Sequence, residues 1–135
     1  VILTIYKMNT DKKGEYKHKD ITGKILKAAF EVHNTLGCGF LEKVYQRALI
    51  YELQQEGLKL EIQKAIRIIY KGQDIGVYIA DIIAEDKIII ELKVVDYLTV
   101  IHKAQALNYL RASGKEVALI LNFAKPKLEY KRVVA

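Results

Sequence analysis

Two neighbouring segments, residues 79–83 and 88–95, are aliphatic at mostly consecutive positions rather than alternating ones. A strand with one solvent face alternates apolar and polar residues, whereas a strand covered on both faces is apolar throughout. These segments therefore predict central strands that other elements cover on both faces. That requirement favours a layered α/β fold over a sheet with one open face.

The spacing of apolar residues elsewhere predicts the covering helices. One helix is expected to begin with Asp20 as its N-cap and to end at Gly37. A second is expected over residues 40–56 and a third over residues 99–112, with Gly114 as its terminator. The positions expected to form the apolar face of the second helix are Leu41, Val44, Ala48 and Tyr51.

Strand-type sequence covers five segments, which are residues 59–70, 75–83, 88–95, 117–123 and 128–134. The element order is therefore ααβββαββ. The path from the third strand through the third helix to the fourth strand is typical of a right-handed parallel crossover. We expect an α/β fold in which helices flank a mixed central sheet.

The composition fits one compact domain, because the chain has 135 residues of which 51% are hydrophobic and 28% charged. We expect a basic, partly disordered extension over residues 1–19 and a single domain over residues 20–135. The formal net charge is +6, but residues 7–27 hold seven lysines against three acids, which leaves the remainder nearly balanced. Net charge alone therefore does not indicate a nucleic-acid interface.

The expected cellular location rests on features that the sequence lacks. The one cysteine, Cys38, excludes an internal disulfide and a cysteine-based zinc site. No apolar run is long enough to span a membrane, and the first residues do not have the pattern of a signal peptide. We therefore expect a cytoplasmic protein with no membrane partner.

Three charged residues, Asp81, Glu91 and Lys93, interrupt the central strands. Glu91 and Lys93 are two apart and so point to the same face of a strand. If the loop between the strands is residues 85–87, Asp81 lies opposite Glu91, with about 5 Å between their Cβ atoms. A two-residue turn would instead send Glu91 to the other face.

Like charges that face one another on a half-buried sheet are destabilising unless something compensates them. A hard divalent cation such as Mg²⁺ suits two carboxylates, and Lys93 beside it could position a water or offset charge on a phosphate. The alternative is that Glu91 and Lys93 form a local ion pair while Asp81 caps a turn. The first hypothesis predicts a metal site and the second only a stable strand end.

Two pairs of helical residues are candidates to complete the site. Gln105 and Tyr109 are four apart on the third expected helix and share a face. Glu42 and Tyr45 are three apart at the start of the second. Both pairs have simpler explanations: a polar helix edge for the first, and for Glu42 the favourable helix dipole in a first turn.

These residues together resemble a known family. The segment Gly39-Phe40-Leu41-Glu42-Lys43-Val44-Tyr45 matches the pattern of the GxxExxY proteins, which belong to the PD-(D/E)XK nuclease superfamily. The similarity continues in order through Asp81, Glu91-Leu92-Lys93, Gln105 to Tyr109 and Leu121-Asn122-Phe123, and covers about residues 20–134.

The resemblance implies a restriction-endonuclease-like core with a two-acid metal site. Asp81, Glu91 and the main-chain carbonyl of Leu92 would hold Mg²⁺ or Mn²⁺, and Lys93 would assist the attacking water. Glu42 would add a helical acid to the metal site, and Gln105 with Tyr109 would form a Q-x-x-x-Y motif. The chain departs from the family at Cys38, where proline is usual, and at Ile79, where arginine is common.

The function expected from these features is metal-dependent hydrolysis of phosphodiester bonds in nucleic acid, with DNA as the expected partner. A second hypothesis is a catalytically weak or silent module of the same fold that binds nucleic acid or protein. A third is a homodimer that is active only when assembled, because two copies would lengthen a short groove.

Overall fold

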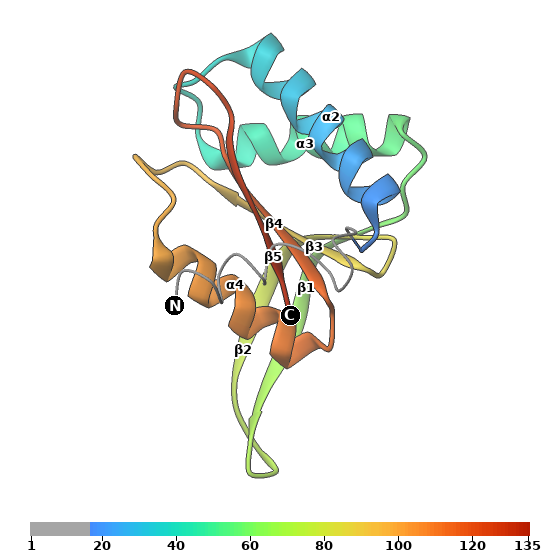
Figure 1. The fold of residues 1–135 in the computed structure, drawn as a ribbon, viewed down its shortest axis with the longest axis vertical. Helices are drawn as coiled ribbons and strands as arrows, with labels where there is room; N and C mark the ends of the chain where they lie inside the picture. The colour runs from blue at the N-terminus through green and yellow to red at the C-terminus, as the bar shows by residue number, and fades with distance from the viewer. Residues whose placement is uncertain (1–16) are drawn as a thin grey trace.

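The computed structural model describes residues 17–135 (Figure 1). The elements are α2 (Lys19–Leu36), α3 (Glu42–Gln55), β1 (Leu60–Tyr70), β2 (Gln73–Ala84), β3 (Ile88–Lys93), α4 (Val100–Ser113), β4 (Val117–Asn122) and β5 (Glu129–Val134). Their order is the predicted ααβββαββ. Most of the predicted basic extension lies outside the described residues, so the division into extension and domain stays a prediction.

The strands of residues 17–135 form one five-stranded sheet in the order β1-β2-β3-β4-β5. Only β3 and β4 in this sheet run parallel, and α4 connects them. The other neighbouring pairs are antiparallel. The predicted mixed sheet, with a parallel crossover between its third and fourth strands, is therefore confirmed.

Helices cover the sheet on both faces (Figure 1). One buried cluster joins α2 and α3 to the sheet and includes Ile88, Ile90 and Leu92 of β3. The cluster on the opposite face joins α4 to the sheet and includes Ile89. Successive β3 side chains thus enter different cores, which explains why the segment is apolar throughout.

Two local predictions about the helices are wrong. Asp20 is not the N-cap of α2: His18 holds that position, and Asp20 lies in the first turn. On α3 the expected apolar face is largely exposed, at Leu41, Val44 and Tyr51. The side chains of α3 that are fully buried are Tyr45, Leu49 and Leu53.

The loop between β2 and β3 decides the register on which the candidate site depends. Ala84 lies opposite Ile88, so the loop is the three residues 85–87. Glu85 and Asp86 have φ angles of 53° and 57°, and the main-chain N–H of Lys87 donates to the carbonyl of Ala84 at 2.9 Å. The three-residue loop therefore contains a tight turn whose two central residues, Glu85 and Asp86, are left-handed. Such a turn suits the twist of an antiparallel pair.

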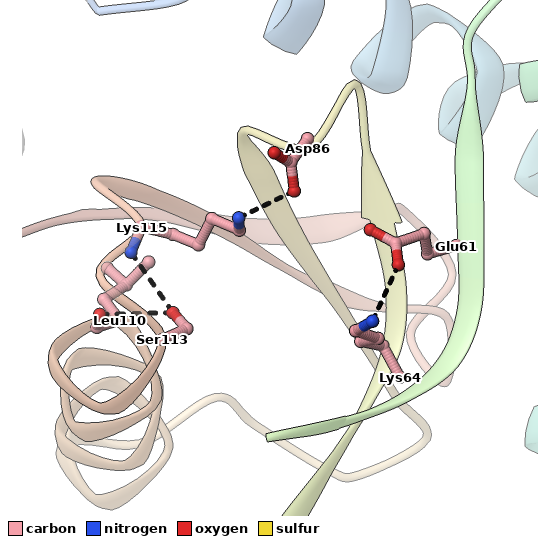
Figure 2. Close-up of polar contacts among 6 residues, drawn as sticks. All are labelled: Glu61, Lys64, Asp86, Leu110, Ser113 and Lys115. Carbon is pink, nitrogen blue, oxygen red and sulfur yellow. Dashed lines mark hydrogen bonds and ion pairs between the residues drawn. The ribbon is translucent and has the colours of Figure 1, made fainter. Parts of the chain in front are cut away.

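An ion pair joins this loop to the end of α4, as Figure 2 shows. Lys115 Nζ lies 2.8 Å from Asp86 Oδ1, and the main-chain N–H of Lys115 donates to the Ser113 hydroxyl. The Ser113 hydroxyl in turn donates to the carbonyl of Leu110, within the last turn of α4. The C-terminal end of α4 is thereby fixed against the end of the sheet away from Lys93.

No helix in the described part of the chain is long and apolar enough to cross a membrane.

Candidate active site

The ladder between β2 and β3 ends with the pair Ile82 and Ile90, one position before Asp81 and Glu91. The strands are then joined through side chains. The main-chain N–H of Leu92 donates to Asp81 Oδ2 at 2.9 Å, and the Asp81 main chain lowers the pKa of the Glu91 carboxyl. Asp81 therefore contacts the main chain of the neighbouring strand instead of capping a turn, and its joint role with Glu91 stays a prediction.

A backbone irregularity accompanies this break in the ladder. Ile82 belongs to the core beneath α2 and α3, whereas Ala80 belongs to the core beneath α4. The alternation of β2 side chains thus shifts by one residue at Asp81. On β1, Gln63 lies between the residues paired with Ile82 and Ala80, and it has a left-handed φ of 52°. A left-handed non-glycine residue is uncommon within a strand, and here it accompanies the shift of the β2 side chains.

Glu91 has the most strongly shifted pKa of the site. Its side chain is 6% exposed, and burial raises its pKa from 4.5 to about 7. Lys93 opposes that shift and Glu42 adds to it. Although Lys93 affects the pKa of Glu91, the two side chains do not form an ion pair, because all ion pairs of residues 17–135 involve other partners.

Asp81 and Glu42 belong to the same electrostatic neighbourhood. Burial raises the pKa of Asp81, against the hydrogen bond from Leu92 and the charge of Lys93. Burial also raises the pKa of Glu42, at the start of α3, and Asp81 raises it further while Lys93 lowers it. We call Glu42, Asp81 and Glu91 the acid cluster. The charge of Lys93 lowers the pKa of each residue in the acid cluster.

The oxygen donors of the acid cluster fit a hard divalent cation. Glu91 Oε1 is buried and has no hydrogen-bond partner, which leaves one carboxylate oxygen without compensation. Mg²⁺ commonly uses only one or two protein carboxylates and keeps waters for its other positions. Within residues 17–135, however, no three His, Cys, Asp or Glu side chains are close enough to hold a metal by themselves. The arrangement therefore suits a two-carboxylate site rather than a three-carboxylate cage.

Tyr45 is a core residue, although its spacing from Glu42 predicts that it helps to complete the site. Its side chain is fully buried and its ring stacks on Phe123 with 4.8 Å between centroids. Its hydroxyl donates to the carbonyl of Gly37 at 2.6 Å and accepts the main-chain N–H of Phe40 at 3.2 Å. Tyr45 thus ties the α2–α3 loop to the core and fixes where α3, and with it Glu42, begins.

The two candidates on α4 differ in their surroundings. Tyr109 stacks on Tyr78 of β2, with 3.4 Å between ring centroids and 6° between ring planes. Burial raises the pKa of Tyr109, and Glu91 raises it further, so Tyr109 is near the acid cluster. Gln105 is exposed one turn earlier. Tyr78 was not predicted as a site residue. The sequence shows only an aromatic residue two positions before Ala80 in the same strand.

Replacing Tyr45 by Phe should lower the free energy of unfolding by about 1–3 kcal/mol, because the Gly37 carbonyl and the Phe40 N–H lose their partner while the ring stack survives. Urea unfolding measures the change. The control is Tyr51→Phe on the same helix, where the side chain is 59% exposed and the free energy of unfolding should stay within about 0.5 kcal/mol. Equal effects of the two substitutions would contradict the assigned role of the Tyr45 hydroxyl.

Replacing Glu91 by Gln should stabilise the metal-free protein at pH 8 by about 3 kcal/mol. The folded-state pKa of Glu91 is raised from 4.5 to about 7, so ionisation of the folded protein removes stability as the pH rises through that range. Near pH 4 the difference between the two proteins should vanish. Urea unfolding at both pH values, with a chelator present, gives the result.

The matched control for that experiment is Glu116→Gln. Lys17 lowers the pKa of Glu116 through a hydrogen bond and its charge, so this substitution should reduce stability at pH 8 and lose its effect in acid. A Glu91→Gln protein that is less stable than the parent at pH 8 would show that the Glu91 carboxylate is compensated in the fold.

Comparison with known proteins identifies the family. A family model described as the PD-(D/E)XK nuclease superfamily matches residues 19–133. The crystal structure of SSO0001 has a similar fold, with a TM-score of 0.54 and 19% sequence identity; the match covers 87% of this chain but only 57% of that one. No curated protein matches the chain. Members of the matched superfamily are mostly nucleases and generally use divalent metals. The family match, together with the order of the elements, shows that the chain belongs to the PD-(D/E)XK nuclease superfamily.

Proposed function

We propose that the protein hydrolyses phosphodiester bonds of nucleic acid, with DNA as its substrate, and that it belongs to the GxxExxY group of its superfamily. The observation that carries this proposal is the Glu91 carboxylate, which is buried beside Asp81 with its Oε1 unpartnered. A buried acid of this kind is destabilising unless it serves a ligand.

The residues that would hold Mg²⁺ or Mn²⁺ are Asp81, Glu91 and the main-chain carbonyl of Leu92, with Glu42 reaching in from α3. An ion bound there would polarise a phosphate oxygen and lower the pKa of a bound water. The protein contributes the position of the donors. Asp81 is fixed by the N–H of Leu92, and Glu91 is buried in β3.

Lys93 would act on the phosphate and on the water, since its charge already lowers the pKa of each residue of the acid cluster. Its ammonium group can donate hydrogen bonds to an attacking water and offset the negative charge that develops on the phosphate. Gln105 and Tyr109 would contact the substrate from α4, where Gln105 is exposed and Tyr109 is held by its stack on Tyr78.

Substitution of Asp81 by Asn and of Lys93 by Ala should each reduce cleavage of DNA at least about 100-fold, as expected for loss of a ligand or of a preorganised cation. Cleavage of plasmid and of single-stranded DNA with Mg²⁺ or Mn²⁺ is the measurement. The matched controls are Asp74→Asn at the hairpin tip and Lys87→Ala in the β2–β3 loop, which should keep full activity. Cleavage that persists in both site variants would arise from another site or another protein.

Metal binding should release protons, because a carboxylate must be ionised to bind a cation. With a Glu91 pKa of about 7, roughly half a proton should be released at pH 7 and far less at pH 8.5. Calorimetric titration with Mn²⁺ in two buffers of different ionisation enthalpy counts these protons. Glu91→Gln should abolish the release; an unchanged release would place the ion elsewhere.

A second function is favoured by one observation. No three acidic or other metal-ligating side chains among the described residues form a ready metal group. Lack of a ready metal group is what we expect of a catalytically weak or silent module that binds nucleic acid or protein. Absence of both Mn²⁺ binding and cleavage, with nucleic-acid binding retained, would favour this function.

A homodimer and a cytoplasmic location stay predictions.

A further inference from the structure

A cavity of about 320 Å³ lies between the loop that follows β3 and the loop that follows β4. Its lining residues are Val95, Asp96 and Tyr97 from the first loop and Ala124, Lys125 and Pro126 from the second. This volume is at the lower end of the range for small-molecule sites, which suits a single nucleotide and not a double helix.

The loops that line the cavity continue directly from the ends of β3 and β4. Val95 follows two residues after Lys93, and the second wall follows Phe123, whose main-chain N–H donates to the carbonyl of Lys93 at 3.0 Å. β3 and β4 are parallel, so both walls start from the carboxyl ends of parallel strands. Ligands of open α/β sheets commonly bind at that edge.

A buried asparagine holds the two walls together. Asn122 is fully buried, and its Oδ1 accepts the main-chain N–H groups of Val95 at 3.1 Å and Ala124 at 3.2 Å. Its Nδ2 donates to the Val95 carbonyl at 2.8 Å and to Glu129 Oε1 at 2.9 Å. A satisfied buried network of this kind rigidifies its surroundings, so the cavity is preorganised rather than an accident of two mobile loops.

The cavity presents three complementary groups. The Tyr97 ring is 66% exposed, and the ammonium group of Lys125 lies 4.4 Å from the ring centroid. Lys125 is itself placed by its carbonyl, which lies 2.7 Å from His33 Nε2. Asp96 adds an acceptor, which the amino edge of a base can satisfy and a phosphate cannot. The groups therefore match an aromatic ring with polar edges joined to an anion.

We propose that this cavity binds one unstacked nucleotide of a single-stranded nucleic acid, next to the phosphate that the acid cluster would receive. The base stacks on the face of the Tyr97 ring that Lys125 does not cover, and the adjoining phosphate contacts Lys125. Stacking on a side chain requires a free base face, which a paired and stacked duplex does not offer. This inference rests on the proposed nuclease function, since it names the form of the substrate.

Binding without cleavage tests the inference. Anisotropy of a labelled 12-nucleotide single strand is measured with the full chain carrying Asp81→Asn, in the presence of a chelator. Adding Tyr97→Ala should weaken binding roughly 10-fold, whereas Tyr97→Phe should retain it. Adding Lys125→Ala should weaken binding and reduce the slope of log K against log salt by about 0.7, the value for one phosphate contact on a single strand.

The hairpin tip offers a matched control. Tyr70 is 56% exposed and has the ammonium group of Lys71 over its ring at 5.4 Å, so it repeats the same pair of groups away from the cavity. In Figure 1 this tip projects from the body of the molecule, at the end opposite α2 and α3. Tyr70→Ala and Lys71→Ala should leave the affinity unchanged. Thermal unfolding of every variant confirms that the fold is retained.

Three results would overturn the inference: equal losses at Tyr97 and Tyr70, a blunt duplex of the same length that binds as tightly as the single strand, or no loss with Tyr97→Ala. Its failure is distinguishable from failure of the proposed function. Cleavage that depends on Asp81 but not on Tyr97 or Lys125 keeps the nuclease and removes the nucleotide subsite. Binding that depends on Tyr97 without any metal-dependent cleavage keeps the subsite and removes the nuclease.

Discussion

The candidate site depends on one interaction, the replacement of main-chain pairing by the hydrogen bond of the Asp81 carboxylate to the Leu92 N–H where β2 and β3 part. After Ile82 and Ile90 the ladder stops, and Asp81 bonds the Leu92 N–H instead. The three-residue loop sets the register that brings Asp81 to the main chain of Leu92, the residue after Glu91. A loop one residue shorter would have placed Glu91 on the other face relative to Asp81.

The acid cluster is destabilising for the folded protein, and the fold compensates it only in part. Glu91 keeps an unpartnered oxygen, and Lys93 is a shared neighbour rather than an ion-pair partner. The surrounding cores can offset this local cost, because β3 packs apolar side chains into both of them. Stability is thus concentrated in the aliphatic strand positions, whereas the charged positions of the same strand are the ones proposed to bind a ligand.

Much of the fold could be predicted from sequence, because its signals are local. Consecutive aliphatic residues identify β3 as a central strand, and glycines mark the helix ends. The buried face of α3 could not be predicted, since Leu41, Val44 and Tyr51 make a second apolar stripe and only packing against Phe123 selects Tyr45. For the site, spacing identifies the acids but leaves their register open until the loop is seen. The stack of Tyr78 on Tyr109 joins distant segments and has no local signal.

The central claim is that Asp81 and Glu91 jointly hold a divalent cation between β2 and β3. Anomalous diffraction from crystals soaked in Mn²⁺ tests this claim most directly. We expect a single strong peak about 2.1 Å from a carboxylate oxygen of each residue, with Lys93 beside it. A peak elsewhere in the molecule, or none at a Mn²⁺ concentration that supports DNA cleavage, would contradict it.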